Sequence, residues 1–148
     1  MKYFCLFLCL AFCNNTQAQS SEDSVKSAVN QLFTAMKNAD SALLVSSFAD
    51  SAILQTIVDK NGKVEIKTEA ISGFAQQVGK MQKGSLDERI QFDVVRIDGA
   101  LAIVWAPSKF YFKGNFSHCG VDSFQLVRVN GKWKIQYLVD TRRSQGCE

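Results

Sequence analysis

The sequence predicts an α+β domain, in which three amino-terminal helices pack on one face of a cone-shaped, curved antiparallel sheet. Apolar residues recur at helical spacing over 21–38, over a short segment after Asp40 and after Thr68, whereas the chain after about residue 87 is strand-like and contains three tight-turn signals. Apolar side chains of the last four expected strands can also be aligned on one face, which gives the sheet a core side.

Composition limits the chain to one globular domain with a modest charge. It has 148 residues, of which 47% are hydrophobic and 21% are charged, and it contains a single proline. The segment after residue 18 carries 16 Lys and Arg against 14 Asp and Glu. Nucleic-acid binding would need clustered basic residues, and none are present, so we expect no nucleic-acid partner.

The first 18 residues have the pattern of a cleaved secretory signal peptide. Lys2 precedes an apolar run over 3–13 that is too short to span a bilayer, and the small Ala18 follows a polar stretch. The alternative interpretation is a buried amino-terminal helix. We expect cleavage after Ala18, which leaves a secreted or periplasmic domain of residues 19–148 with no membrane contact.

Three helices are expected before residue 80. The first covers 21–38, where apolar residues repeat at i, i+3, i+4 and i+7. Asp40 begins a short second helix with Leu43, Leu44 and Phe48 on its apolar side. Between them and the third helix, the sequence predicts strands at 52–58 and 64–67, joined at Asn61-Gly62, and Thr68 is expected to cap that third helix.

The remaining chain predicts a four-stranded meander. Asp98-Gly99, Gly114-Asn115 and Asn130-Gly131 are read as two-residue hairpin loops, which pair residue 97 with 100, 113 with 116 and 129 with 132. This register places one face inward, in layers that run from aliphatic through aromatic to ionisable. The layers are Val94, Ile103, Leu126 and Ile135; Phe92, Trp105, Phe124 and Tyr137; Ile90, Pro107, Asp122 and Val139; Glu88, Lys109, Gly120 and Thr141; and Tyr111, His118 and Arg143. Asp140 and Arg142 fall on the outer face by the same alternation.

The order of elements resembles the nuclear transport factor 2-like superfamily, also described as cystatin-like, over essentially the whole mature chain. Residues 40–56 are similar to its second helix and first strand. Residues 118–126, Trp133-Lys134-Ile135 and 140–143 are similar to small secreted bacterial proteins of the SnoaL-like or putative lumazine-binding type. The resemblance implies a homodimer through the outer sheet face, but this superfamily includes enzymes, ligand binders and assembly modules, so fold alone does not assign function.

Cys119 and Cys147 are the two cysteines that remain after signal cleavage. An even number in an exported chain predicts a disulfide, and the alternative is two buried or free thiols. One histidine and a bridged cysteine do not supply the ligands of a usual metal site, so we expect no metal and no cofactor.

Asp122 and His118 are the candidate catalytic residues. A carboxyl beside an aromatic layer has a raised pKa and could act as a general base, and the imidazole could move a proton at the mouth of the cone. For both residues the alternative is a satisfied structural group, such as an ion pair of Asp122 with Lys109 or Arg143. Candidate ligand contacts are Trp105, Phe124, Tyr137, Phe92, Lys109, Tyr111 and Arg143.

Three functions remain open at this point. The first is binding of a small, partly apolar molecule of unknown identity in the cone. The second is an enzyme similar to ketosteroid isomerase or a dehydratase, with Asp122 or His118 as proton carrier and Tyr111 or Lys109 stabilising an oxyanion. The third is a dimeric assembly module with a filled cone.

Overall fold

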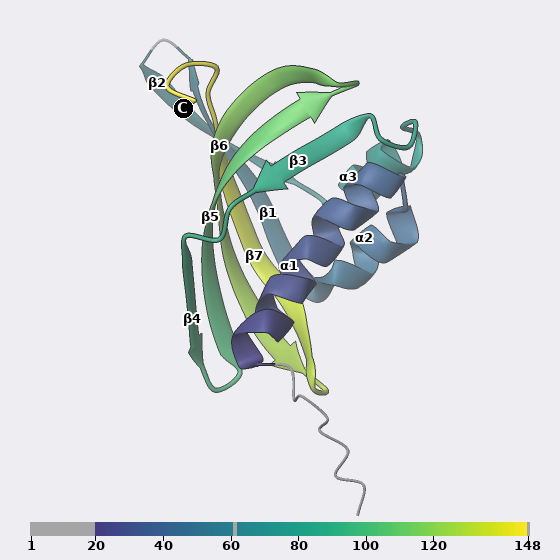
Figure 1. Cartoon of the computed structure of the whole chain (residues 1–148), viewed down its shortest axis with the longest axis vertical. Coiled ribbons are helices and arrows are strands. Elements are labelled where there is room, and N and C mark those ends of the chain that lie inside the picture. Colours follow the sequence, from purple (N-terminus) through teal and green to yellow (C-terminus); the bar gives the residue numbers. More distant parts are fainter. Residues whose placement is uncertain (1–19, 61, 148) are drawn as a thin grey trace, which may run out of the picture.

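The computed structural model describes residues 20–60 and 62–147, apart from the side chain of Lys60. The expected signal peptide lies outside these residues. Three helices cover one side of a single seven-stranded sheet, which curves around the first helix without closing into a barrel (Figure 1). The predicted fold class is therefore confirmed. No helix in the described part of the chain is long and apolar enough to cross a membrane.

The helices form close to where the sequence predicts them. α1 (Ser21–Asn38) is capped by Ser20, whose hydroxyl accepts a hydrogen bond from the backbone N–H of Asp23. α2 (Ser41–Ser47) is capped by Asp40, whose carboxylate accepts a hydrogen bond from the backbone N–H of Leu43. α3 (Ile71–Gly79) follows Ala70 and has no side-chain cap. The predicted capping role of Thr68 is wrong, because this residue belongs to a strand and its hydroxyl accepts a hydrogen bond from Gln55.

The sheet has the strand order β2-β1-β7-β6-β5-β3, with β4 also paired to β5. The strands are β1 (Phe48–Lys60), β2 (Lys63–Glu69), β3 (Leu86–Ile90), β4 (Val94–Asp98), β5 (Leu101–Phe112), β6 (Asn115–Val129) and β7 (Lys132–Arg142). β1 and β7 run parallel, and every other pair is antiparallel. This order brings β1, from the amino-terminal half, beside the carboxyl-terminal strand.

Only one of the three predicted hairpin registers is confirmed. Val129 pairs with Lys132 as expected, but Asp98 pairs with Leu101, and Phe112 pairs with Asn115 across a Lys113-Gly114 loop. Both residues of that loop have positive φ, of 49° and 81°, as a tight hairpin turn requires. A bulge in β6 follows the turn, because Tyr111 pairs with Phe116 but Phe110 pairs with His118, and beyond it the β5–β6 register differs by one residue from the prediction.

The one-residue difference turns β5 over. Its buried face carries small side chains, Ala102, Val104, Ala106 and Ser108, whereas Leu101, Ile103 and Trp105 are 43–47% exposed on the outer face. The prediction that Ile103, Trp105, Pro107, Lys109 and Tyr111 face the core is wrong. The small residues pair with the large buried side chains of β6, Val104 with Phe124 and Ala102 with Leu126, so the packed layer keeps its volume.

β7 changes face part-way along. Trp133 and Ile135 are buried, and so are Leu138 and Asp140, because the β6–β7 register shifts by one residue between Gln125 and Leu126. Tyr137, Val139 and Thr141 thus lie on the outer face, and the outward placement predicted for Asp140 and Arg142 is wrong. The core then consists of the inner sheet face and the apolar side of α1, where Val25, Val29, Leu32, Ala35 and Met36 are buried.

Candidate functional site

A pocket of about 130 Å³ lies between α1, α3 and the inner face of the sheet. Its first half is apolar and is formed by side chains from α1, α3 and four strands. These are Leu32, Phe33, Met36, Phe74, Leu54, Leu86, Phe110 and Leu138. Phe33 is held in place from behind by Phe124, whose ring it meets edge to face at 6.2 Å between centroids.

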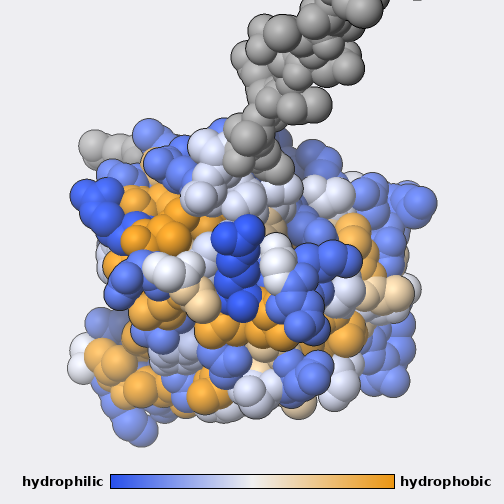
Figure 2. Space-filling view, turned by 90° about the horizontal axis from the view of Figure 1, so that it is seen from below, coloured by the Kyte–Doolittle hydropathy of each residue, from blue (hydrophilic) through white to orange (hydrophobic). Residues whose placement is uncertain are grey.

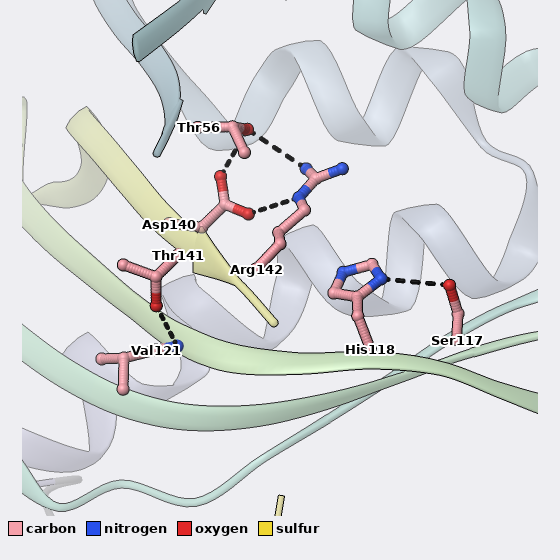
Figure 3. Close-up of polar contacts among 7 residues, drawn as sticks. All are labelled: Thr56, Ser117, His118, Val121, Asp140, Thr141 and Arg142. Carbon is pink, nitrogen blue, oxygen red and sulfur yellow. Dashed lines mark hydrogen bonds and ion pairs between the residues drawn. The ribbon is translucent and has the colours of Figure 1, made fainter. Parts of the chain in front are cut away.

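The second half of the pocket is polar and draws on β1, β2, β3, β6 and β7. The residues concerned are Thr56, Glu69, Glu88, His118, Asp122, Asp140 and Arg142. Figure 3 shows Thr56, Asp140 and Arg142 meeting above the strands, with the ring of His118 on the same side of the sheet. Residues far apart in the sequence thus share one small cavity.

Asp140 is fully satisfied. Its Oδ1 accepts a hydrogen bond of 2.6 Å from the Thr56 hydroxyl, and its Oδ2 accepts one of 2.6 Å from Nε of Arg142. Arg142 also donates from Nη2 to the Thr56 hydroxyl at 3.2 Å. Both carboxylate oxygens of the buried Asp140 therefore have a charged or hydroxyl donor.

Asp122 is not satisfied. Only 5% of the residue is exposed, and its Oδ2 has no hydrogen-bond partner. Burial raises its pKa well above the usual value, and repulsion from Glu88 and Asp140 adds to the increase, while Ser108 and Arg142 act in the opposite direction. A buried oxygen without a partner is costly, so Asp122 is the residue of the pocket that a bound group would relieve.

Glu88 is the second carboxyl with a raised pKa. Its pKa is raised from 4.5 to about 7. Burial is the largest cause and Asp140 acts in the same direction, whereas a hydrogen bond with Ser108 and the charge of Arg142 lower the pKa. Near neutral pH, Glu88 and Asp122 therefore form a pair that holds at least part of its protons.

His118 lines the same pocket and is neutral near pH 7. Burial lowers the pKa of its imidazole, and the charge of Arg142 lowers it further, with Asp140 acting against both. Its Nδ1 lies 3.1 Å from the Ser117 hydroxyl, and its ring lies 5.0 Å from that of Phe110. A neutral imidazole can accept or donate a proton, as general acid–base chemistry requires.

The structure brings Asp122 and His118 together in one pocket, as the sequence predicts, since the alternation along β6 is correct. Phe124 is on the inner face too, but it supports the wall from behind. Phe92 packs at the edge of the core, with the Lys26 ammonium 5.7 Å from its ring, and does not line this pocket.

The other predicted ligand contacts lie elsewhere. Trp105 is exposed on the outer face, and Tyr137 donates from its hydroxyl to Gln55 on that face. Tyr111 stacks under the guanidinium of Arg89, at 4.1 Å, and Lys109 lines a separate groove with Arg143 beside the disulfide. Their predicted place at the pocket is wrong, because the register of β5 and the bulge in β7 reverse the faces. The predicted Glu88–Lys109 pairing is wrong as well, since Glu88 lies opposite Phe110.

Asp140, Arg142 and Thr56 are the functional candidates that the sequence prediction missed. A strict alternation cannot find Asp140 and Arg142, because an extra residue in β7 changes the phase between Ile135 and Leu138. The apolar run Leu138-Val139 directly before Asp140 is the signal that could have indicated such a phase change.

Cys119 and Cys147 form the predicted disulfide, with their Cα atoms 5.6 Å apart. The bond fastens the carboxyl-terminal segment to β6, next to His118. Among the described residues, no group of three or more His, Cys, Asp and Glu is arranged to hold a metal ion. The groups that the pocket offers for chemistry are therefore carboxyls, an imidazole and an arginine, next to apolar side chains.

The fold is similar to that of several solved proteins. An NTF2-like protein of unknown function from Shewanella baltica OS155 is 19% identical, with 82% of this chain and 93% of that chain covered and a TM-score of 0.63. A cystatin-like domain of unknown function from Nostoc punctiforme PCC 73102 is 17% identical, with 87% and 82% covered and a TM-score of 0.65. A putative dehydratase of the NTF2-like family from Streptomyces avermitilis is 15% identical, with 82% and 95% covered and a TM-score of 0.58.

At these identities the similarity shows the fold alone. None of the curated proteins matches the sequence. The family model described as putative lumazine-binding matches residues 20–137, which include every strand and helix up to the middle of β7. This chain therefore belongs to the putative lumazine-binding family and has the nuclear transport factor 2-like fold.

Proposed function

We propose that the protein binds a small, partly apolar molecule in the pocket between α1, α3 and the sheet. The observation that carries this proposal is the buried Oδ2 of Asp122, which has no hydrogen-bond partner and lines a cavity whose other half is apolar. A ligand that reaches this oxygen would satisfy it, and the apolar half of the pocket would bury the rest of the ligand.

The volume indicates the size of the ligand. A cavity of about 150 Å³ in another protein accommodates benzene, and the pocket here measures about 130 Å³. The family description supports small-molecule binding as a class. Lumazine itself has two fused rings, so a ligand with a single-ring body fits the volume better.

Ligand-observed NMR with a library of single-ring fragments tests this proposal. We expect fragments that bind the wild type to lose binding in Leu86→Trp, which fills the pocket, and to retain it in Leu101→Trp, a matched change on the exposed outer face. Fragments that bind all three proteins equally, or no binding to the wild type, would contradict the proposal.

A second candidate is proton-transfer catalysis of the isomerase or dehydratase type. It is favoured by the presence of a carboxyl with a raised pKa and a neutral imidazole in one pocket, Asp122 and His118. Arg142 takes the place of Tyr111 and Lys109 as the group available to an oxyanion, because those two residues lie outside the pocket. The name of the Streptomyces avermitilis relative, a putative dehydratase, agrees with this class.

Asp122→Asn separates catalysis from binding. If the protein is such an enzyme, this variant should lose turnover of an identified substrate by about 100-fold or more and keep most of its affinity. Equal turnover by the wild type and the variant would exclude Asp122 as proton carrier.

An unfilled pocket weighs against the third hypothesis, an assembly module with a filled interior.

We also propose that the mature chain, released after Ala18, is exported and forms a homodimer through its outer sheet face. Support comes from the exposed apolar side chains of β5, Leu101, Ile103 and Trp105. Hydrophobic side chains also show among hydrophilic ones at the end of the molecule where α1 begins (Figure 2). Light scattering should give a dimer for the wild type and a monomer for Trp105→Lys, and a wild-type monomer would contradict the proposal.

A further inference from the structure

The polar half of the pocket contains more carboxyls than cations. Glu69, Glu88, Asp122 and Asp140 line it, and Arg142 is the one arginine or lysine among the lining residues that the structure describes. His118 adds no charge near neutral pH, because burial and the charge of Arg142 lower the pKa of its imidazole. An incoming group therefore meets an excess of acidic side chains.

Two of the four carboxyls already have donors. Asp140 accepts from Thr56 and Arg142, and Glu69 accepts a hydrogen bond of 2.7 Å from the Gln77 amide. These pairs engage the arginine and the nearby amide. Asp122 and Glu88 feel the charge of Arg142, but among the described residues neither has a basic side chain as a hydrogen-bond or ion-pair partner.

The remaining two are Asp122 and Glu88. They extend from the inner faces of β6 and β3, on either side of β5, and repel each other when both are ionised. The neutral Ser108 hydroxyl on β5 contributes a hydrogen bond to the pair but no charge. Asp122 is only 5% exposed, and its Oδ2 is left without a hydrogen-bond partner. The buried Asp122 and the half-buried Glu88, with no cation bound to either, favour a ligand that brings one.

The apolar half of the pocket is compatible with a cation as well. Phe33, Phe74 and Phe110 line it, and aromatic rings attract cations where aliphatic side chains do not. Their rings would also bury a flat apolar body of the size that the cavity volume allows.

We propose that the pocket selects a small organic cation, whose charged nitrogen donors reach the carboxyls of Asp122 and Glu88 and whose single-ring body lies among the phenylalanines. This inference rests on the proposed binding function and adds the charge and donor character of the ligand. An amidinium or a ring-bearing ammonium has this chemistry, and an anionic ligand does not.

Proton release follows from the same arrangement. In the empty pocket, burial raises the pKa of Asp122 well above its usual value and that of Glu88 to about 7, so the pair keeps part of its protons near neutral pH. A cation favours the ionised carboxyls, so its binding should displace protons into the solvent. The other charged or titratable groups that face the pair are His118 on β6, Asp140 and Arg142 on β7, and Glu69 at the end of β2.

Benzamidine, benzamide and benzoate provide a matched series of probes. They have nearly the same shape, with a cationic, a neutral and an anionic head, and differ mainly in charge. Isothermal titration at pH 7 should show that benzamidine binds the wild type about tenfold or more tightly than benzamide, and that benzoate binds most weakly. Repeating the benzamidine titration in buffers with different ionisation enthalpies should show net proton release.

Three isosteric variants assign that preference to the proposed carboxyls. Asp122→Asn and Glu88→Gln should each reduce the benzamidine preference by about tenfold and leave benzamide affinity within about threefold. Asp93→Asn, an exposed aspartate outside the pocket, is the matched control and should behave as the wild type. Two independent pocket variants keep the test valid if one of them does not fold.

The outcomes separate this inference from the proposed function. If benzamide or benzoate binds as tightly as benzamidine or more tightly, and Leu86→Trp abolishes this binding, cation selection is overturned and pocket binding stays intact. No binding of any of the three probes would also overturn cation selection, and the fragment screen would then decide on pocket binding by itself. A benzamidine preference that survives both pocket variants would show that the cation is held elsewhere, which contradicts the inference.

Discussion

Glu88 and Asp122 make the stability of the free protein depend on pH in an unusual direction. An acid whose folded pKa lies above its unfolded value binds more protons when folded, so the folded state loses stability as pH rises through that interval. For Glu88 the interval runs from 4.5 to about 7, and the shift of Asp122 acts in the same direction. We therefore expect the melting temperature of the unliganded protein to fall between about pH 5 and pH 8.

Glu88→Gln checks the cause. The variant should melt higher than the wild type at pH 8, by a stability difference on the order of 2 kcal/mol, and the two should converge near pH 4. Thermal denaturation across this pH range, with Asp93→Asn as the control, is the measurement. A wild-type melting temperature that rises with pH would contradict the assignment.

Replacing Arg142 should lower the free energy of unfolding more than replacing its neighbour Arg143. Removing Arg142 leaves the buried carboxylate of Asp140 with the Thr56 hydroxyl alone, whereas the Nε of Arg143 donates only to the backbone oxygen of Gly146. The Arg142 side chain is 49% exposed, so solvent reduces the effect. Arg142→Ala should cost about 1–2 kcal/mol in chemical denaturation and Arg143→Ala less than about 0.5 kcal/mol; equal losses would argue against the Asp140 pair.

Single residues on β6 could be predicted from the sequence, and those on β7 could not. Asp122 and His118 follow an uninterrupted alternation that ends in the buried Phe124 and Leu126, so their face was correct. Asp140 and Arg142 follow a bulge, and the position of an extra residue depends on pairing with β6 and β1, which the local pattern does not contain.

At the level of elements, β5 shows how one extra residue in a neighbouring strand reverses a face. The loop is Lys113-Gly114 instead of Gly114-Asn115, but moving a two-residue loop by one position leaves the same faces paired. The reversal of β5 comes from a bulge in β6, where Phe116 pairs with Tyr111 but His118 pairs with Phe110, so that Ser117 is an extra residue. The sequence of β5 does not arbitrate, because Leu101, Ala102, Ile103, Val104, Trp105 and Ala106 are all apolar. The structure resolves it through size, with small side chains inward against Phe124 and Leu126.

The close approach of β6 and β7 depends on Gly120. A Cβ at this position would lie 1.7 Å from the backbone oxygen of Thr141, and a backbone atom cannot move away as a flexible side chain can. Gly120→Ala should therefore destabilise the protein by about 3 kcal/mol or more. Gly73→Ala in α3, where the Cβ would meet nothing within 4 Å, should be neutral or stabilising by about 0.5 kcal/mol. Equal denaturation midpoints for the two variants would contradict this packing.

For the whole molecule, the disulfide closes the carboxyl-terminal end onto the sheet. Cys119 and Cys147 are 28 positions apart, and a closed loop of this length stabilises a fold by about 3–4 kcal/mol in the chain-entropy estimate. Cys147→Ser should lose a stability of about that size in urea, and reduction of the wild type should reproduce the loss. Two alkylatable thiols in the unreduced protein would contradict the bridge.

The overall fold was predictable because it depends on features that tolerate a local error. The spacing of apolar residues gives α1 and α2, and the order of helices and strands gives the covered sheet, whichever way β5 faces. The pocket depends on register, so its polar half could be anticipated only where a strand runs without a bulge. The reversal of β5 replaces Trp105 in the interior by Ala106, which leaves space beside Asp122.

The protonation of Asp122 and Glu88 in the free protein tests the central claim most directly, since it requires both carboxyls to lie inward in one pocket. Carbon-13 NMR of the labelled carboxyl groups can follow each through a pH titration. The account predicts that Glu88 titrates near pH 7 and Asp122 well above its usual range, with the pKa of Asp122 falling in Glu88→Gln. Ordinary titration of both carboxyls below about pH 5, with no change in the variant, would contradict it.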